Sequence, residues 1–279
     1  MIDLIVEPFQ YSFMLRALFV SSMIGIICPV LGSYVVIRGM GFMGDAMAHS
    51  VLPGIVIALI VGVSPFLGSV PMAILVAVTV GYLIRSKAVT EDTAFGVLFA
   101  GLFSIGLVII SDAGRLAESV EDILLGQILG VSNSDILISF ILTMVVMISL
   151  IAFHRQLIFS GFDPVGSVVA GLNVGALNYM FLILLGIAIV VTLHVVGVVL
   201  VVGLLVTPSA AAQLVIRRFT KAMMLAISFG LISAVTGLYV SYYFDLPSGP
   251  VITLVSFVIF LFCVIYSRIL GQAQASQLM

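Results

Sequence analysis

Long apolar stretches separated by short polar turns dominate this chain. They occur at 12–37, 42–62, 66–84, 93–111, 132–153, 178–194, 197–215, 222–243 and 249–270. A helix needs roughly 20 apolar residues to cross the hydrocarbon core of a bilayer. The pattern predicts an all-α, polytopic membrane protein with eight or nine transmembrane helices, eight if 178–194 and 197–215 form one span. We expect residues 1–279 to make a single transmembrane domain.

Composition supports this fold class and excludes several functions. The chain is 63% hydrophobic and 8% charged, with a mean hydropathy of +1.39, whereas soluble domains average about 25% charged residues. It has no basic patch of the kind that binds nucleic acid. It also lacks the GxxxxGK[ST] phosphate loop, so it is not expected to hydrolyse ATP by that route. Cys28 and Cys263 lie far apart in apolar stretches, which is typical of packing residues.

The basic residues predict how the helices cross the membrane. If the N-terminus is outside and nine spans follow, only Arg16 and Arg115 lie on the outer side. The cytosolic side then holds Arg38, Arg85, Lys87, Arg155, Arg217, Arg218, Lys221 and Arg268. This distribution obeys the positive-inside rule. The N-terminus does not resemble a signal peptide, because the acidic residues Asp3 and Glu7 stand where a signal peptide has basic residues.

Acidic residues gather on the predicted outer side. Their charge either attracts cations or has no meaning for the topology, because the positive-inside rule concerns only Lys and Arg. They are Asp3, Glu7, Asp112, Glu118, Glu121, Asp122 and Asp245. Within this region, SVEDILLGQILG (119–130) predicts a short helix that begins with an S-x-x-D cap. We expect it either to shape a docking surface or to pack as a re-entrant segment.

A carboxylate and an imidazole stand at the start of the second apolar stretch. Asp45 and His49 are four residues apart in GFMGDAMAHSVLPG (41–54), so on a helix they share one face. Carboxylate oxygen and imidazole nitrogen suit Mn²⁺, Zn²⁺ or Fe²⁺. An ionisable residue near hydrocarbon marks an ion pathway or a paired structural site. Pro53 follows within the same stretch, and broken helices are common in transport pathways.

A purely structural interpretation of these residues is also open. Asp45 could cap a helix that begins near Ala46 or could pair with Arg38, and His49 could be a hydrogen-bonded residue of the bundle. The spacing of the pair favours the cation pathway, and two ligands suit a site that the ion must leave. His194, in TLHVVG, is interpreted as a polar helix end, with a third ligand or an entry residue as alternatives.

Three segments resemble the membrane permease of bacterial metal-ion ABC importers, the manganese/zinc/iron group called the ABC-3 family. The first and most specific is GSYVVIRGMGFMGDAMAHSVLPG (32–54). The others are VGVVLVVGLLVTPSAAAQL (196–214) and YYFDLPSGPVITLV (242–255). Their order and spacing extend the resemblance over nearly the whole chain, and the first segment looks closest to the manganese members.

The resemblance implies a fold, a site and partners. The fold would be that of type II, vitamin B12-importer-like permeases with fewer helices, in a bacterial plasma membrane. The permease would be a homodimer with its pathway at the dimer interface, and Asp45 and His49 would contact the metal. A cytosolic ATP-binding subunit would bind the ATP, and an extracytoplasmic metal-binding protein would deliver the ion. Lipid would surround the chain, which would have no catalytic residues and no resident cofactor.

The cytosolic segment 154–176 contains signals for a short helix. Asp163 suits an N-cap, Pro164 the first helical position and Gly171 a C-terminal stop. We expect about two turns over 163–171, which the resemblance identifies as the helix that couples the permease to its ATPase. The PVGS start departs from the family's usual acidic or alanine-rich one. An ordinary connecting loop is the alternative.

The predicted function is therefore the permease subunit of an ATP-driven importer for a divalent transition metal, manganese by preference and zinc or iron otherwise. Neutral His49 would be needed for binding, so uptake should fall at acidic pH. One alternative is a secondary metal transporter or channel that works without ATP. Another is a permease for export or for a non-metal substrate, in which Asp45→Asn would leave metal uptake unchanged.

Overall fold

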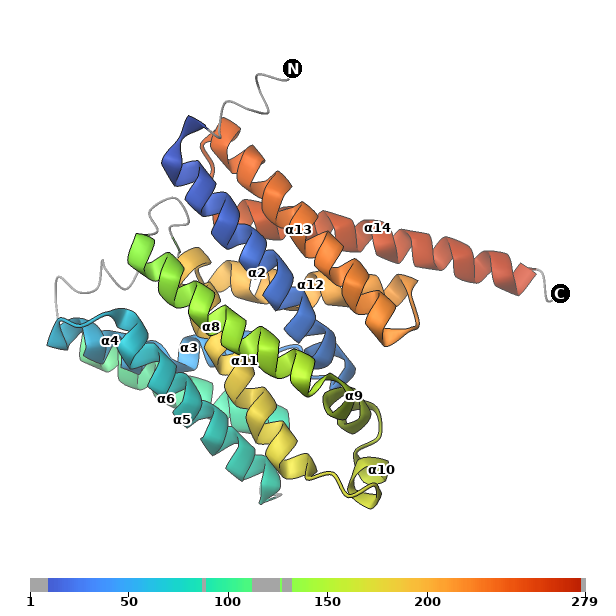
Figure 1. The fold of residues 1–279 in the computed structure, drawn as a ribbon, viewed down its shortest axis with the longest axis horizontal. Coiled ribbons are helices and arrows are strands. Elements are labelled where there is room, and N and C mark those ends of the chain that lie inside the picture. The colour runs from blue at the N-terminus through green and yellow to red at the C-terminus, as the bar shows by residue number, and fades with distance from the viewer. Residues whose placement is uncertain (1–9, 87–88, 112–125, 127–131, 277–279) are drawn as a thin grey trace.

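The computed structural model describes residues 10–86, 89–111, 126 and 132–276, and these form a bundle of helices (Figure 1). The helices are α2 (Ser12–Ile37), α3 (Met43–Ser50), α4 (Leu52–Val61), α5 (Pro65–Arg85), α6 (Glu91–Ser111), α8 (Asn133–Ala152), α9 (His154–Phe162), α10 (Pro164–Val169), α11 (Val174–Val196), α12 (Val198–Val215), α13 (Phe219–Phe244) and α14 (Ser248–Ser276).

The described part of the chain contains nine helices long and apolar enough to cross a membrane, counting α3 and α4 together. The sequence left open whether α11 and α12 form one span. They are separate because Gly197 lies between them with φ +81° and ψ 171°, in a region of backbone space that favours glycine. The all-α membrane fold predicted from the apolar stretches is confirmed, with nine spans.

Some helices begin earlier than their apolar stretches. The stretch predicted at 178–194 belongs to a helix that starts at Val174, because the side chain of Asn173 accepts a hydrogen bond from the N–H of Ala176 and caps it. Likewise, α13 begins at Phe219 rather than at 222. Capping and amphipathic first turns extend a helix into water, beyond the part that hydropathy detects.

Helices α2 and α11 lie at the centre of the bundle. In the most apolar window of α2, 78% of residues are buried, against 17% in α6. Helices α12 and α13 pack along α2, and α5 packs along α11. The peripheral helices expose large apolar side chains such as Leu67, Val108 and Phe262, as expected for surfaces that face lipid or other apolar chains.

Two glycines set the spacing between α4 and α5. A Cβ atom added at Gly68 would lie 1.9 Å from the carbonyl oxygen of Gly54, and one at Gly54 would lie 2.4 Å from that of Gly68. Small residues allow such close approach of helix backbones in membranes. This contact fixes the first turn of α4, the helix that follows α3, which carries Asp45 and His49.

We expect Gly68→Ala to destabilise the fold by about 1–3 kcal/mol, the usual cost of overpacking, because the new methyl group meets backbone. Gly96→Ala is the matched control, since no atom lies within 4 Å of a Cβ at Gly96. Thermal unfolding of the detergent-purified protein, followed by size exclusion, would measure both. Equal thermal midpoints for the two variants would contradict the close contact.

Candidate metal site

The helix that carries the candidate site is short because its surroundings stop it at both ends. Before it, α2 ends at Ile37, and Gly39 follows with φ +72°. The N–H groups of Gly39 and Met40 donate to the main-chain oxygens of Val36 and Val35. After it, Val51 separates α3 from α4. Pro53 has no N–H to give to the carbonyl of His49, so the helical ladder is interrupted at that turn. The site therefore lies on a helix of eight residues beside a break in the span.

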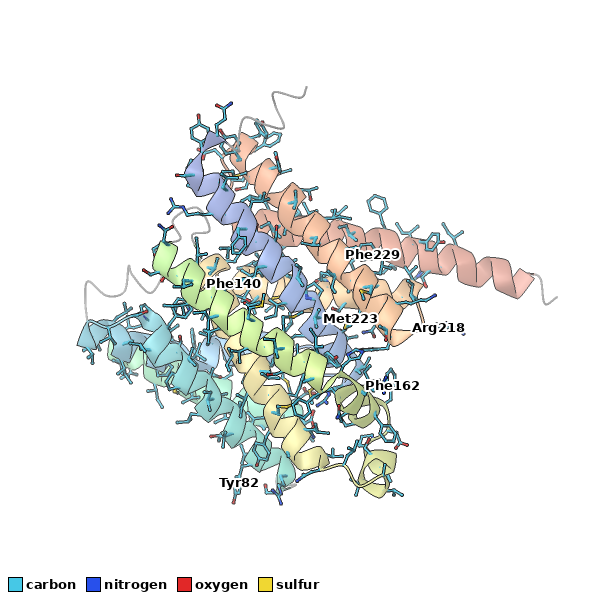
Figure 2. The ribbon with its side chains drawn as sticks, viewed as in Figure 1. Tyr82, Phe140, Phe162, Arg218, Met223 and Phe229 are labelled. Atoms are coloured by element: carbon cyan, nitrogen blue, oxygen red, sulfur yellow. The ribbon has the colours of Figure 1, made fainter. Side chains whose placement is uncertain are left out.

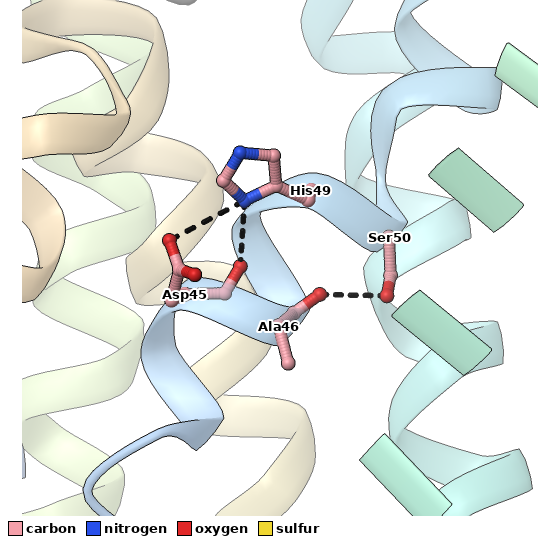
Figure 3. A network of polar contacts seen from close by, with 4 residues as sticks. All are labelled: Asp45, Ala46, His49 and Ser50. Atoms are coloured by element: carbon pink, nitrogen blue, oxygen red, sulfur yellow. Dashed lines mark hydrogen bonds and ion pairs between the residues drawn. The ribbon is translucent and has the colours of Figure 1, made fainter. Parts of the chain in front are cut away.

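Asp45 and His49 are in contact on one face of α3 (Figure 3). Nδ1 of His49 lies 3.0 Å from the main-chain oxygen of Asp45 and 3.4 Å from its Oδ1. A carbonyl oxygen only accepts hydrogen bonds, so Nδ1 carries the proton. In the neutral ring Nε2 then keeps its lone pair, and Figure 3 shows that this nitrogen points away from α3. A hydrogen bond of this kind orients a histidine for metal binding through its other nitrogen.

Two aromatic rings of α6 hold the imidazole from the other side. The rings of Phe99 and Phe103 meet that of His49 nearly edge to face, with centroids 5.3 and 5.2 Å away. The side chains of His49 and Asp45 remain 22% and 31% exposed. An ion can therefore reach them, while the two rings restrict how the imidazole turns. The sequence pattern did not predict that these two phenylalanines contact His49.

One chain offers two candidate ligands at this site, Asp45 and His49. Among the residues that the structure describes, no group of three or more His, Cys, Asp or Glu side chains is close enough to hold a metal ion. Transition metals in proteins take four or more ligands. If Asp45 and His49 bind a metal ion, the described part of one chain offers only these two of the usual ligand types.

His194 has a similar main-chain contact but a different environment. Its Nδ1 donates to the oxygen of Val190 at 3.0 Å, and its Nε2 lies 3.5 Å from Oγ of Ser69. The ring also stacks on Phe66 with centroids 4.2 Å apart. Both nitrogens and one ring face are therefore engaged, which agrees with the interpretation of His194 as a polar residue at a helix end.

Arg38 does not pair with Asp45, although the sequence left that possibility open. Its guanidinium donates to Oδ1 of Asn178 at 2.8 Å and to Oγ of Ser160 at 3.3 Å, and it lies over the ring of Phe181. Burial lowers the pKa of Arg38, with Glu91 and Tyr34 opposing this effect. The arginine thus ties the end of α2 to α9 and α11. Its partners are more than 100 residues away in the chain, so no local pattern predicted them.

The short helix expected near residue 163 is α10, Pro164–Val169. The side chain of Asp163 accepts a hydrogen bond from the N–H of Gly166 at 2.8 Å, and Pro164 occupies the first turn. Gly171 follows the helix with φ +83°. Three valines of α10 are strongly exposed, Val165, Val168 and Val169. The predicted outer helix at 119–130 lies outside the described residues, except for Gly126.

Comparison with known proteins places the chain in a family. Residues 10–267 match the ABC 3 transport family. The chain is 39% identical to the manganese transport system membrane protein MntC of Listeria monocytogenes, over 92% of each chain. It is 37% identical to a probable iron transport system membrane protein of Haemophilus influenzae, over 96% of this chain and 99% of that one.

Two solved structures share its fold. The first is PsaBC from Streptococcus pneumoniae in complex with Fab, with a TM-score of 0.83, 29% identity and coverage of 94% of this chain and 95% of that one. The second is an inward-facing putative metal-chelate type ABC transporter, with a TM-score of 0.74 and 15% identity, covering 91% and 86%. Together, the family match, the relatives and the nine spanning helices establish that the chain is an integral membrane protein that belongs to the ABC 3 transport family.

Proposed function

We propose that this chain is the permease subunit of an ATP-driven importer for a divalent transition metal ion, manganese by preference. The observation that carries the proposal is the contact between Asp45 and His49, which leaves Nε2 of His49 open. The relatives named as manganese and iron transport proteins support the class of substrate. The metal is cargo, held briefly and then released.

The permease works as a homodimer in this proposal. Each chain offers one carboxylate and one imidazole, and two copies related by a twofold axis would offer two of each. Such a set of four suits a transition metal. A site shared between two chains also opens when they move apart, which lets the ion leave without breaking either chain's own packing.

The cytosolic partner is an ATP-binding subunit that docks on α10. The exposed valines at positions 165, 168 and 169 form an apolar surface of the kind that protein partners cover. Helix α9 links α10 to the membrane, and Ser160 of α9 is bonded to Arg38 at the end of α2. A movement of α10 can therefore reach the segment that leads into α3. An extracytoplasmic metal-binding protein would deliver the ion to the outer face.

The choice of manganese rests on similarity rather than on the ligands. Carboxylate and imidazole accept Mn²⁺, Zn²⁺ and Fe²⁺, and intrinsic affinity does not favour Mn²⁺ among them. Three of the curated relatives are manganese proteins at 38–39% identity, and iron proteins follow at 37% and below. We therefore propose manganese, with iron as the second candidate.

Removal of either ligand should abolish metal uptake. We expect Asp45→Asn and His49→Gln to lower manganese accumulation by more than the roughly 10- to 100-fold that loss of a supporting partner costs. Elemental analysis of cells supplied with Mn, Zn and Fe together would measure this and identify the metal.

His194→Gln is the matched control, because His194 has the same Nδ1 contact to a carbonyl four residues earlier. It should keep most of the uptake. Unchanged accumulation in both the Asp45 and the His49 variants would mean that the pair is structural and that the pathway lies elsewhere.

The ATPase contact should depend on the apolar surface of α10. We expect Val165→Asp and Val169→Asp to reduce co-purification of the ATP-binding subunit at least about tenfold, since a charge on an interface core is strongly unfavourable. Val89→Asp is the control, because Val89 is an exposed residue just before α6. If the α10 variants still transport metal without the partner, the chain is a secondary transporter or channel instead.

A further inference from the structure

A groove of about 320 Å³ opens on the side of the bundle between α2, α8 and α13. We call it the α2–α8–α13 groove. In Figure 1, α8 and α13 lie on either side of α2, and both contact it. Most of its lining is aliphatic or thioether. The lining residues are Val30, Tyr34, Met147, Leu150, Ile151, His154, Thr220, Met223, Met224 and Ile227.

The groove lies in the cytosolic half of the membrane in the orientation that the basic residues give. It uses the last turns of α2, the last turns of α8 and the first turns of α13. All three of these ends belong to the side that carries α9 and α10. Figure 2 labels Met223 on α13 and Arg218 at its N-cap position. The ring of Phe162, on α9, packs against that of Phe219, the first residue of α13.

The cytosolic end of the groove is closed by polar and aromatic contacts that leave no free charge. The hydroxyl of Tyr34 is hydrogen-bonded to Nδ1 of His154, and Phe219 packs against both rings. Burial and then the nearby Arg155 lower the pKa of His154. Both effects favour the neutral imidazole, and no acidic residue is present among the described lining residues.

Three basic residues are next to this closed end in the chain, and one of them, Arg155, is close enough to His154 to act on it electrostatically. Arg155 follows His154, and Lys221 follows Thr220, so each is adjacent to a lining residue. Arg218 stands at the N-cap position of α13. All three residues are exposed. The arrangement is thus an apolar groove with cations at the end that meets the cytosolic surface.

We propose that the α2–α8–α13 groove binds an anionic phospholipid of the cytosolic leaflet, with an acyl chain in the groove and the phosphate held by Arg155, Arg218 and Lys221. Basic pockets between transmembrane helices on the cytosolic side are known to bind anionic headgroups. Unbranched, polarizable methionines such as Met147, Met223 and Met224 adapt to a flexible chain. The inference goes beyond the proposed function and does not depend on which metal is carried.

Such a lipid would join two parts of the bundle that carry the cytosolic machinery. It would contact α8 and the start of α9 on one side and α13 on the other. Helix α9 leads directly into α10. The bound lipid would therefore hold the base of the α9–α10 segment against α13, and its loss would loosen the support of α10.

Native mass spectrometry of the assembled importer would test the headgroup contact. After purification with equal amounts of phosphatidylglycerol and phosphatidylcholine of the same chain length, we expect preferential retention of phosphatidylglycerol. Each of Arg155→Gln, Arg218→Gln and Lys221→Gln should weaken this retention about fivefold. Arg85→Gln, at the cytosolic end of α5 and outside the groove lining, should not. Equal retention of both lipids, or no effect of the three substitutions, would overturn the proposal.

Photo-cross-linking of the unsubstituted protein with a photoreactive lipid would identify what occupies the groove. With a diazirine in the acyl chain of phosphatidylglycerol, we expect adducts on peptides that contain Met223 and Met224. Ile227→Trp, which fills the groove, should remove these adducts and leave adducts on α14 unchanged. Adducts only on other helices would overturn the proposal. So would a photoreactive residue at position 224 that cross-links two copies of this chain, because a second copy would then cover the groove.

Discussion

In a bilayer no water is available to satisfy backbone hydrogen bonds, so each spanning segment must satisfy its own. This constraint produces the nine membrane-spanning helical segments of the described chain, and it makes every interruption of a helix informative. In the described chain, Val51 interrupts a single span between α3 and α4, whereas Gly197 separates two spans, α11 and α12. Val51 lies directly after the helix that carries Asp45 and His49. The candidate site thus lies next to an interruption of the helical hydrogen-bond pattern, and broken helices are common in the pathways of transport proteins.

His49 and His194, the two histidines within spanning helices, differ in the surroundings of Nε2. A histidine is a candidate ligand only where this nitrogen is free. Both rings give Nδ1 to the carbonyl four residues earlier, at 3.0 Å. His194 then places Nε2 near Ser69 and stacks on Phe66, whereas His49 touches the edges of two phenylalanines beside a carboxylate. The same local contact therefore supports a structural role at one position and a metal-binding role at the other.

The sequence predicted features that depend on neighbours in the chain. Hydropathy located the spans, and the four-residue spacing predicted the contact between Asp45 and His49. Capping rules placed α10, whose N-cap is Asp163. The sequence did not predict contacts between distant segments, such as Arg38 with Asn178 or Tyr34 with His154. Such contacts depend on how helices pack, and in a chain that is apolar nearly everywhere the hydrophobic pattern does not specify which faces meet.

The central claim is that Nε2 of His49 binds the transported metal and that two copies share one ion. Pulsed electron paramagnetic resonance of Mn²⁺ bound to the assembled importer, with ¹⁵N-labelled histidine, measures this directly. The account predicts coupling of each Mn²⁺ to two equivalent histidine nitrogens, lost in His49→Gln and kept in His194→Gln. Coupling that survives in His49→Gln, or bound Mn²⁺ without any nitrogen coupling, would contradict it.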